Sequence, residues 1–415
     1  MLRNSSIRAI VFIWIAWVVI VLGYQAIVPA RYTISKPDNV LSWTPRETRP
    51  TSQDDQPYLL DPFLNAQVSW DSEFYLSIAT LGYDDPQVRS ISVLGTTLSL
   101  NYAFFPMYSY TVRLVALPLS ILGLSPIATS TLAAVIVSAL GALAAMLALY
   151  DMTRDELSDA GGIRAAFYLI IFPTGFFLVQ VYTEGLFVGL AFTSLALMRR
   201  NHRGWAALLA VFATWTRAVG VALVIPLAIT WLRTGEWTDL DMEWKQIITQ
   251  RFPWRTLRNG LIGFAPLIAF IVWKLSWWGA AFSLIEDNFF GRGLFAFNVS
   301  FNNWAAGLRS LSGANSQTAV YYAIEFGAIV LGFVACLSLR RRYPELAWFG
   351  LAVIILSMTS GPAQGMHRYL LAVPPVFVYL SHLGRHPAFD RAWTTASVLL
   401  MGMLAALFAF DMWVG

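Results

Sequence analysis

Residues 126–150 read PIATSTLAAVIVSALGALAAMLALY, a run of 25 residues without a charged side chain. About 20 such residues in a helix cross the hydrocarbon core of a bilayer. Residues 7–28 form a second apolar run beside Arg3 and Arg8. This run is longer than the roughly 7–15 apolar residues at the centre of a signal peptide. Both runs predict transmembrane helices.

The composition of the whole chain also indicates a membrane protein. Of 415 residues, 57% are apolar and 13% are charged, whereas soluble domains carry about 25% charged residues. The mean hydropathy is +0.59. So few charges cannot cover a compact body of this size, so lipid must be part of its solvent. We predict an all-α polytopic membrane protein with one domain over residues 1–415.

The basic residues indicate topology rather than nucleic-acid binding. They stand in short runs at the ends of apolar segments, the signature of the positive-inside rule. If every run faces the cytoplasm, the N-terminus is cytoplasmic and the chain crosses the membrane about eleven times, at roughly 20 residues per crossing. No nucleic-acid partner is expected. The runs are Arg199, Arg200 and Arg203; Arg233, Lys245, Arg251, Arg255 and Arg258; Arg340, Arg341 and Arg342; and Arg385 and Arg391.

Residues 29–125 are expected to form the first outer loop, and residues 126–413 to hold the remaining transmembrane helices. The sequence WDSEFYLSIATLGYDD at 70–85 has helical apolar spacing, which predicts a short amphipathic helix at the outer surface. Residues 102–122 contain two prolines and Arg113, a poor composition for a spanning helix. We therefore predict a second interfacial or re-entrant segment there.

Three later hairpins have charged residues near their turns. Residues 165–198 turn near Glu184, residues 204–232 near Arg217, and residues 345–384 near His367 and Arg368. Short hairpins place their tips at membrane depth, where a charge is costly unless it faces protein or water.

Together with Asp71, these turns put Glu184, Arg217 and Arg368 on the outer side. Arginine suits phosphate oxygens, so this set suggests chemistry on an anionic lipid head group. Cys336 is the single cysteine, and the four histidines match no metal-ligand spacing. No cofactor is predicted; no cluster of metal ligands is visible in the sequence, which does not decide metal dependence.

Each of these residues also has a structural interpretation. Asp71 is a candidate N-cap, and Glu184 a candidate for the favourable first turn of a helix. Arg217 and Arg368 are candidates for snorkelling to lipid head groups. Glu73, two residues beyond Asp71, is expected to point away from it and be solvated. His367 is a candidate for a structural histidine. Residues 286–304 contain one cation, Arg292, and can form either a cover for a site or an interfacial elbow.

The string WDSEFYLSIA at 70–79, followed by Gly82-Tyr83, resembles the luminal motif W-D-x-x-[aromatic]-x-x-I-A-x-x-G-Y of the PIG-V mannosyltransferases. Further blocks follow in the order of that family, so the resemblance covers roughly residues 65–375. These blocks are Phe104-Phe105-Pro106 with Tyr108, Tyr182-Thr183-Glu184, Thr216-Arg217 and Arg368-Tyr369-Leu370.

The resemblance implies a GT-C fold and an enzyme that moves a sugar, typically mannose, from a polyprenyl-phosphate donor to a lipid-linked or glycan acceptor, with inversion. It implies Asp71 as the catalytic base. Arg217 and Arg368 are then expected at the donor phosphate, with Glu184, Trp70, Tyr75 and His367 as further substrate-binding candidates. The chain looks bacterial, which implies a plasma-membrane protein with its site on the extracytoplasmic face.

The chemistry agrees with a single carboxylate. Glycosidases need two because an alkoxide leaves poorly without protonation, whereas a lipid phosphate leaves without a general acid. Two rival interpretations remain: a polytopic transporter or flippase, and a non-catalytic GT-C homologue. Transporters usually show internal repeats, and none is visible at a fixed period here.

Overall fold

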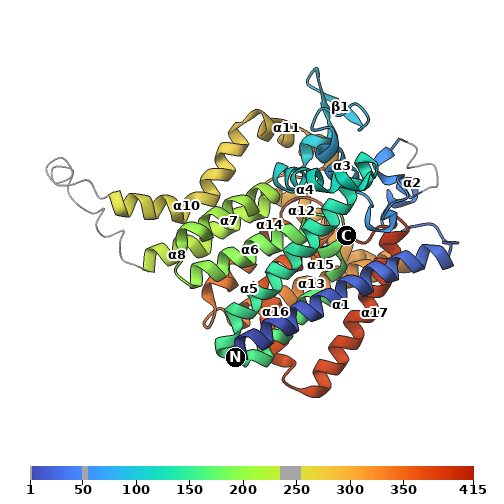
Figure 1. The fold of residues 1–415 in the computed structure, drawn as a ribbon. Coiled ribbons are helices and arrows are strands. Elements are labelled where there is room, and N and C mark those ends of the chain that lie inside the picture. The colour runs from blue at the N-terminus through green and yellow to red at the C-terminus, as the bar shows by residue number, and fades with distance from the viewer. Residues whose placement is uncertain (1, 49–54, 234–253) are drawn as a thin grey trace.

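The structure, a computed structural model, describes residues 2–48, 55–233 and 254–415. The described chain is almost entirely helical (Figure 1). Its helices are α1 (Leu2–Arg31), α2 (Thr44–Glu47), α3 (Ser72–Thr80), α4 (Pro106–Leu119), α5 (Pro126–Ile170), α6 (Glu184–Arg199), α7 (Arg203–Thr216), α8 (Val224–Arg233), α10 (Trp254–Leu275), α11 (Trp277–Ile285), α12 (Phe297–Ser310), α13 (Ser316–Leu339), α14 (Pro344–Met358), α15 (Met366–Tyr369), α16 (Pro374–Leu383) and α17 (Pro387–Ala409).

Five described helices are long and apolar enough to cross a membrane: α1, α5, α10, α13 and α17. Two shorter apolar segments, Ala218–Arg233 and Pro344–Met358, accompany them. The chain is therefore an integral membrane protein, as predicted, and the number of about eleven crossings stays a prediction. The exposed large side chains of α1, such as Phe12 at 73% and Ile20 at 66%, are those of a helix that faces lipid.

Helix α5 forms the centre of the molecule and packs against α6, α4, α1 and α16, while α17 lies alongside α1 (Figure 1). The closest approach of α5 and α6 is at Gly141 and Gly185, where a methyl group on either residue would overlap the backbone of the other helix. Small residues allow this close approach in membrane helices. This contact fixes where the first residue of α6, Glu184, lies.

Residues 151–164 are helical except at Ser158, whose φ is 67°, so α5 consists of two helices that meet at a kink there. The polar residues are satisfied by ion pairs: Arg200 lies 2.8 Å from Asp151, and Glu156 pairs with Arg342. Several predicted basic runs thus meet at one end of the molecule. Lys245, Arg251 and the side chain of Arg255 lie outside the described residues.

The first outer loop folds into short elements at the opposite end (Figure 1). The predicted amphipathic helix is α3, and the predicted segment 102–122 contains α4. Helix α4 has 14 residues, about 21 Å at 1.5 Å per residue, against a hydrocarbon core of about 30 Å. Its Arg113 donates to the carbonyls of Ile78, Ala79 and Thr80 at the end of α3, at 2.7–3.2 Å. The depth of α4 in the membrane stays a prediction.

A hairpin in the same loop was not predicted. Strands β1 (Ser90–Val93) and β2 (Thr96–Ser99) pair antiparallel, with Ser90 opposite Ser99. The two turn residues, Leu94 and Gly95, both have positive φ, at 51° and 80°. Such turns match the right-handed twist of a two-stranded ribbon.

A cavity with an acidic residue and arginines

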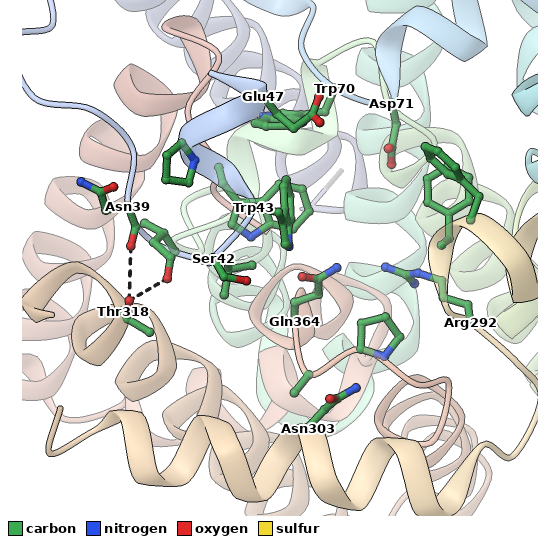
Figure 2. Close-up of a pocket in the computed structure, with 18 of the residues that line it drawn as sticks. Asn39, Ser42, Trp43, Glu47, Trp70, Asp71, Arg292, Asn303, Thr318 and Gln364 are labelled. Carbon is green, nitrogen blue, oxygen red and sulfur yellow. Dashed lines mark hydrogen bonds between the residues drawn. The ribbon is translucent and has the colours of Figure 1, made fainter. Parts of the chain in front are cut away.

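Asp71 lies immediately before α3 and faces a cavity. It occupies the N-cap position of α3, as its structural interpretation expected, but its side chain makes no capping hydrogen bond to the backbone N–H groups of the helix. The segment is fixed by other groups instead: Asp71 N–H donates to Tyr182 Oη at 3.2 Å, and Ser72 Oγ donates to the Val181 carbonyl at 3.0 Å. The carboxylate of Asp71 therefore stays free to point into the cavity (Figure 2).

The cavity has a volume of about 1640 Å³. Its walls come from the first outer loop, from residues 289–292, from α12 and the start of α13, from residues 362–364, and from Arg368 and Trp413. All of these segments lie at the end of the molecule opposite the basic runs. In Figure 2, Asp71 and Arg292 stand on one side, across the cavity from Trp43.

Three of the predicted residues form one buried ion network. Glu184 Oε1 accepts a hydrogen bond from Arg217 Nη1, and Arg368 Nε lies 3.4 Å from the same oxygen. Arg217 also donates to Thr183 Oγ1 at 3.2 Å. Glu184 begins its helix, as its structural interpretation expected. The two arginines do not snorkel, because their charges are paired inside the protein.

Aromatic rings hold the guanidinium of Arg368 in place. It lies 5.2 Å from the centroid of Phe177, 5.3 Å from Tyr182 and 5.4 Å from Tyr369. Cations are attracted to the negative face of such rings. Arg368 reaches the cavity wall, whereas Glu184 and Arg217 stand behind it and line a small adjoining pocket of about 10 Å³ with Arg368.

Arg292 is a site residue that the sequence interpretation did not select. It lines the cavity and donates from Nη1 to Tyr369 Oη at 3.0 Å. Its segment docks on the α14–α15 turn, where Gly293 N–H donates to the Ser360 carbonyl at 2.9 Å. The sequence feature that could have identified Arg292 is its position as a lone cation in a loop rich in glycine and aromatic residues. Within residues 286–304, Phe289, Phe290, Arg292 and Asn303 line the cavity, and the role of this segment as the cover of a site stays a prediction.

Asp71 and Glu73 both have shifted acidities. Burial raises the pKa of Asp71 above its ordinary value, and the charges of Arg368 and Arg292 oppose that rise. Glu73 is 3% exposed and lines the cavity, so the expectation that it is solvated is wrong. The rule that residues two apart diverge applies within a helix, and α3 begins only at Ser72.

The remaining candidates fall in different places. Trp70 lines the cavity and has a left-handed φ of 50°. Tyr75 is buried among Phe104, Tyr108 and Tyr182, at centroid distances of 5.1–6.1 Å. Tyr75 therefore packs behind the ion network of Glu184, Arg217 and Arg368 and supports it there.

His367 does not line the cavity. Its Nδ1 lies 3.1 Å from Glu325 Oε1, and its Nε2 lies 2.7 Å from the Val414 carbonyl. Both ring nitrogens are thus engaged, in agreement with the structural interpretation. Across the described ranges, no group of three or more His, Cys, Asp or Glu side chains is arranged to hold a metal ion.

A family model, Mannosyltransferase (PIG-V), matches residues 50–273, more than half of the chain. No curated protein matches the sequence. Among solved structures, the chain is similar to the Archaeoglobus fulgidus oligosaccharyltransferase crystallised with Zn and sulfate, at 15% identity and a TM-score of 0.42. That match covers 95% of this chain and 53% of the other, so this chain spans about half its length.

It is also similar to ArnT from Cupriavidus metallidurans bound to undecaprenyl phosphate, at 12% identity and a TM-score of 0.42. That match covers 86% of this chain and 75% of the other.

Proposed function

This chain belongs to the PIG-V mannosyltransferase family, and we propose that it is a membrane glycosyltransferase that moves a mannosyl residue from a polyprenyl-phosphate donor to a lipid-linked or glycan acceptor. One observation carries the proposal: Asp71 and the arginines Arg292 and Arg368 face the same cavity. A base and phosphate-binding cations are the groups that such a transfer requires.

In the proposed reaction, Asp71 removes the proton from the acceptor hydroxyl as its oxygen attacks C1 of the sugar. The bond from C1 to the phosphate oxygen breaks, and the lipid phosphate leaves with the electron pair. Attack from the face opposite the phosphate inverts the configuration at C1. General-base help of this kind contributes about 10²–10⁴-fold to the rate.

The arginines have separate parts in this proposal. Arg292 and Arg368, which reach the cavity, bind the donor phosphate and stabilise its growing charge. Arg217 lies behind the part of the cavity wall formed by Arg368, and both arginines form ion pairs with Glu184. Glu184 thus holds Arg368 in position without contacting the donor.

Transfer of labelled mannose from polyprenyl-phosphate mannose, in proteoliposomes that contain host membrane lipids as acceptors, tests the proposal. We expect product from the wild type and a loss of at least 10²-fold in Asp71→Asn. Asp287→Asn, at an exposed position of the short helical segment Glu286–Phe290, is the matched control and should keep full activity. Near wild-type transfer by Asp71→Asn would remove Asp71 from the mechanism. Movement of labelled lipid between leaflets without any transfer would favour a flippase instead.

The proposed orientation puts the cavity on the extracytoplasmic face of a bacterial plasma membrane. It follows from the basic runs at the opposite end of the molecule, because positive charge is retained in the cytoplasm. The lone cysteine, Cys336, is buried, so labelling can test the orientation. A membrane-impermeant maleimide should label Leu94→Cys in intact cells and leave Arg341→Cys unlabelled until the cells are opened. The reverse pattern would invert the topology.

A further inference from the structure

The side of the cavity away from Arg292 is a wall of three tryptophans. Trp43, Trp70 and Trp413, called here the tryptophan wall, meet edge to face with centroid distances of 5.6, 4.9 and 5.3 Å. All three line the cavity and are only partly buried, so part of each ring faces open space. Trp43 stands across from Arg292 in Figure 2.

Three distant segments build this wall. Trp70 Nε1 donates to the Met412 carbonyl at 3.4 Å, and Trp413 N–H donates to Asp38 Oδ2 at 2.7 Å. Trp413 Nε1 donates to Tyr321 Oη at 3.4 Å. The indole N–H of Trp43 has no hydrogen-bond partner among the described residues. Strained backbone at Trp70, with φ of 50°, persists only when the surroundings hold it.

Glu73 stands next to the tryptophan wall. Its N–H donates to the Trp70 carbonyl at 3.3 Å, and its side chain is 97% buried yet lines the cavity. Within the described chain, the carboxyl group makes no hydrogen bond and no ion pair. Because this carboxyl group lines the cavity and is not engaged by the described residues, it is placed to form hydrogen bonds with a ligand.

The charges of the cavity differ between its two sides. The charges of Arg292 and Arg368 act on Asp71, whereas Glu47, across the cavity from Arg292 in Figure 2, is acidic. The groups that act on Glu73 are also acidic: Asp85, from the loop after α3, and Asp411, from the segment after α17. A second phosphate would be repelled there, so the tryptophan wall suits a neutral ligand.

We propose that the tryptophan wall and Glu73 form the acceptor subsite, and that it binds a neutral pyranose sugar. A pyranose has an apolar C–H face that packs on aromatic rings and a rim of hydroxyls that bond to a carboxyl group and an indole N–H. An alkyl chain would leave Glu73 without a partner. This inference rests on the proposed function, because it assigns one side of the cavity to the acceptor and leaves the other to the donor.

Saturation-transfer NMR on the full chain in nanodiscs tests the subsite without requiring catalysis. The probes are the methyl pyranosides of mannose, glucose, galactose and N-acetylglucosamine, and a hexapeptide containing Ser and Thr. We expect transfer to the ring protons of at least one methyl pyranoside, with binding at least tenfold weaker in Trp43→Leu. Trp205→Leu, which removes a tryptophan from the exposed face of α7, should bind like the wild type. Signals from the peptide alone would overturn the proposal.

A matched pair at Glu73 tests the carboxyl group. Glu73→Gln keeps a neutral side chain of the same shape and should retain binding, whereas Glu73→Leu should lose it at least tenfold. Burial, with Asp85 and Asp411, raises the pKa of Glu73 to about 8. A carboxylate accepts hydrogen bonds from hydroxyl groups more strongly than a neutral carboxyl group does, so binding by the wild type should strengthen as the pH rises through about 8 and stay constant in Glu73→Gln. Equal binding by all three proteins at every pH would remove Glu73 from the subsite.

The two proposals fail in distinguishable ways. If pyranosides bind at the tryptophan wall but mannose is never transferred, the proposed function fails and the subsite stands. If mannose is transferred, but no pyranoside binds and Trp43→Leu transfers with an unchanged KM for membrane-lipid acceptors, the subsite fails and the function stands. Thermal unfolding of each variant confirms that it is folded.

Discussion

Arg368 Nε lies 3.4 Å from Oε1 of Glu184, the same oxygen that accepts a hydrogen bond from Arg217. One buried carboxylate thus balances two guanidinium groups from different hairpins. Its second oxygen, Oε2, has no hydrogen-bond partner within the described residues. Removal of this one charge would leave two like charges close together in a region with little water.

We therefore predict that Glu184→Gln destabilises the protein strongly. Removal of one partner from a buried ion pair costs about 3–5 kcal/mol, which should lower the thermal unfolding midpoint in detergent. Glu345→Gln is the control, because Glu345 pairs with Arg199 at 3.1 Å where both side chains are partly exposed. That change should cost at most about 1 kcal/mol. Equal midpoints for the two variants would show that the Glu184 network is not a main source of stability.

A second prediction concerns the pH dependence of transfer. Asp71 must be ionised to act as a base, and burial raises its pKa. The rate should therefore fall, as the pH is lowered, at a higher pH than for an ordinary Asp with a pKa of about 3.9. Arg292 lowers the pKa of Asp71, so its removal should raise that pKa again. The acid limb of the kcat profile should move to higher pH in Arg292→Gln. A limb at the same pH in both proteins would contradict this coupling.

Much of the ion network was accessible from sequence because it depends on local patterns. Hairpin lengths and the positive-inside rule located the turns at Glu184, Arg217 and Arg368. The amphipathic spacing after Asp71 located α3. Each of these inferences needs only the residues of one segment and the thickness of the membrane.

The rest of the site depends on how distant segments dock. Arg292 reaches the cavity because residues 291–296 pack on the α14–α15 turn, and Trp413 reaches it because the end of the chain lies under the first outer loop. Periodicity does not encode such contacts. Glu73 was misjudged because its direction depends on the residue at which α3 begins, and helix ends are the least certain part of a sequence-based prediction.

A third prediction separates donor-binding arginines from other arginines of the cavity. Arg292→Gln should raise the KM for polyprenyl-phosphate mannose by roughly 10–150-fold, the equivalent of the 1.5–3 kcal/mol of a charged hydrogen bond. Arg89 also lines the cavity, but its guanidinium lies over Phe289 at 5.1 Å. Arg89→Gln should therefore change this KM little. Donor titrations in proteoliposomes measure the KM of both variants. Equal increases in KM would indicate that the positive charges of the cavity attract the donor together, and that Arg292 is not a specific ligand of the phosphate.

A fourth prediction distinguishes His367 from the substrate-binding residues. Its ring joins buried Glu325 to the Val414 carbonyl, so His367→Ala should remove one side-chain partner of Glu325 and leave that carboxylate the N–H group of Gly365. We expect a lower unfolding midpoint and, in the protein that remains folded, an unchanged donor KM. A variant of normal stability with a raised donor KM would return His367 to the substrate site.

The last prediction concerns the packing that positions Glu184. Gly185 follows it directly, and a methyl group there would overlap the backbone of Ser138 on α5. A backbone clash cannot be relieved by rotation of a side chain, so Gly185→Ala should push α6 away from α5 and displace Glu184 from Arg217. We expect a loss of folded protein and of transfer activity.

Gly204→Ala, in α7, is the matched control, because a methyl group there would meet nothing within 4 Å. Alanine is also the better helix former, by about 1 kcal/mol, so this variant should be at least as stable as the wild type. Size-exclusion yield and unfolding midpoints measure the contrast, and full stability in Gly185→Ala would mean that the two helices are not held at this contact.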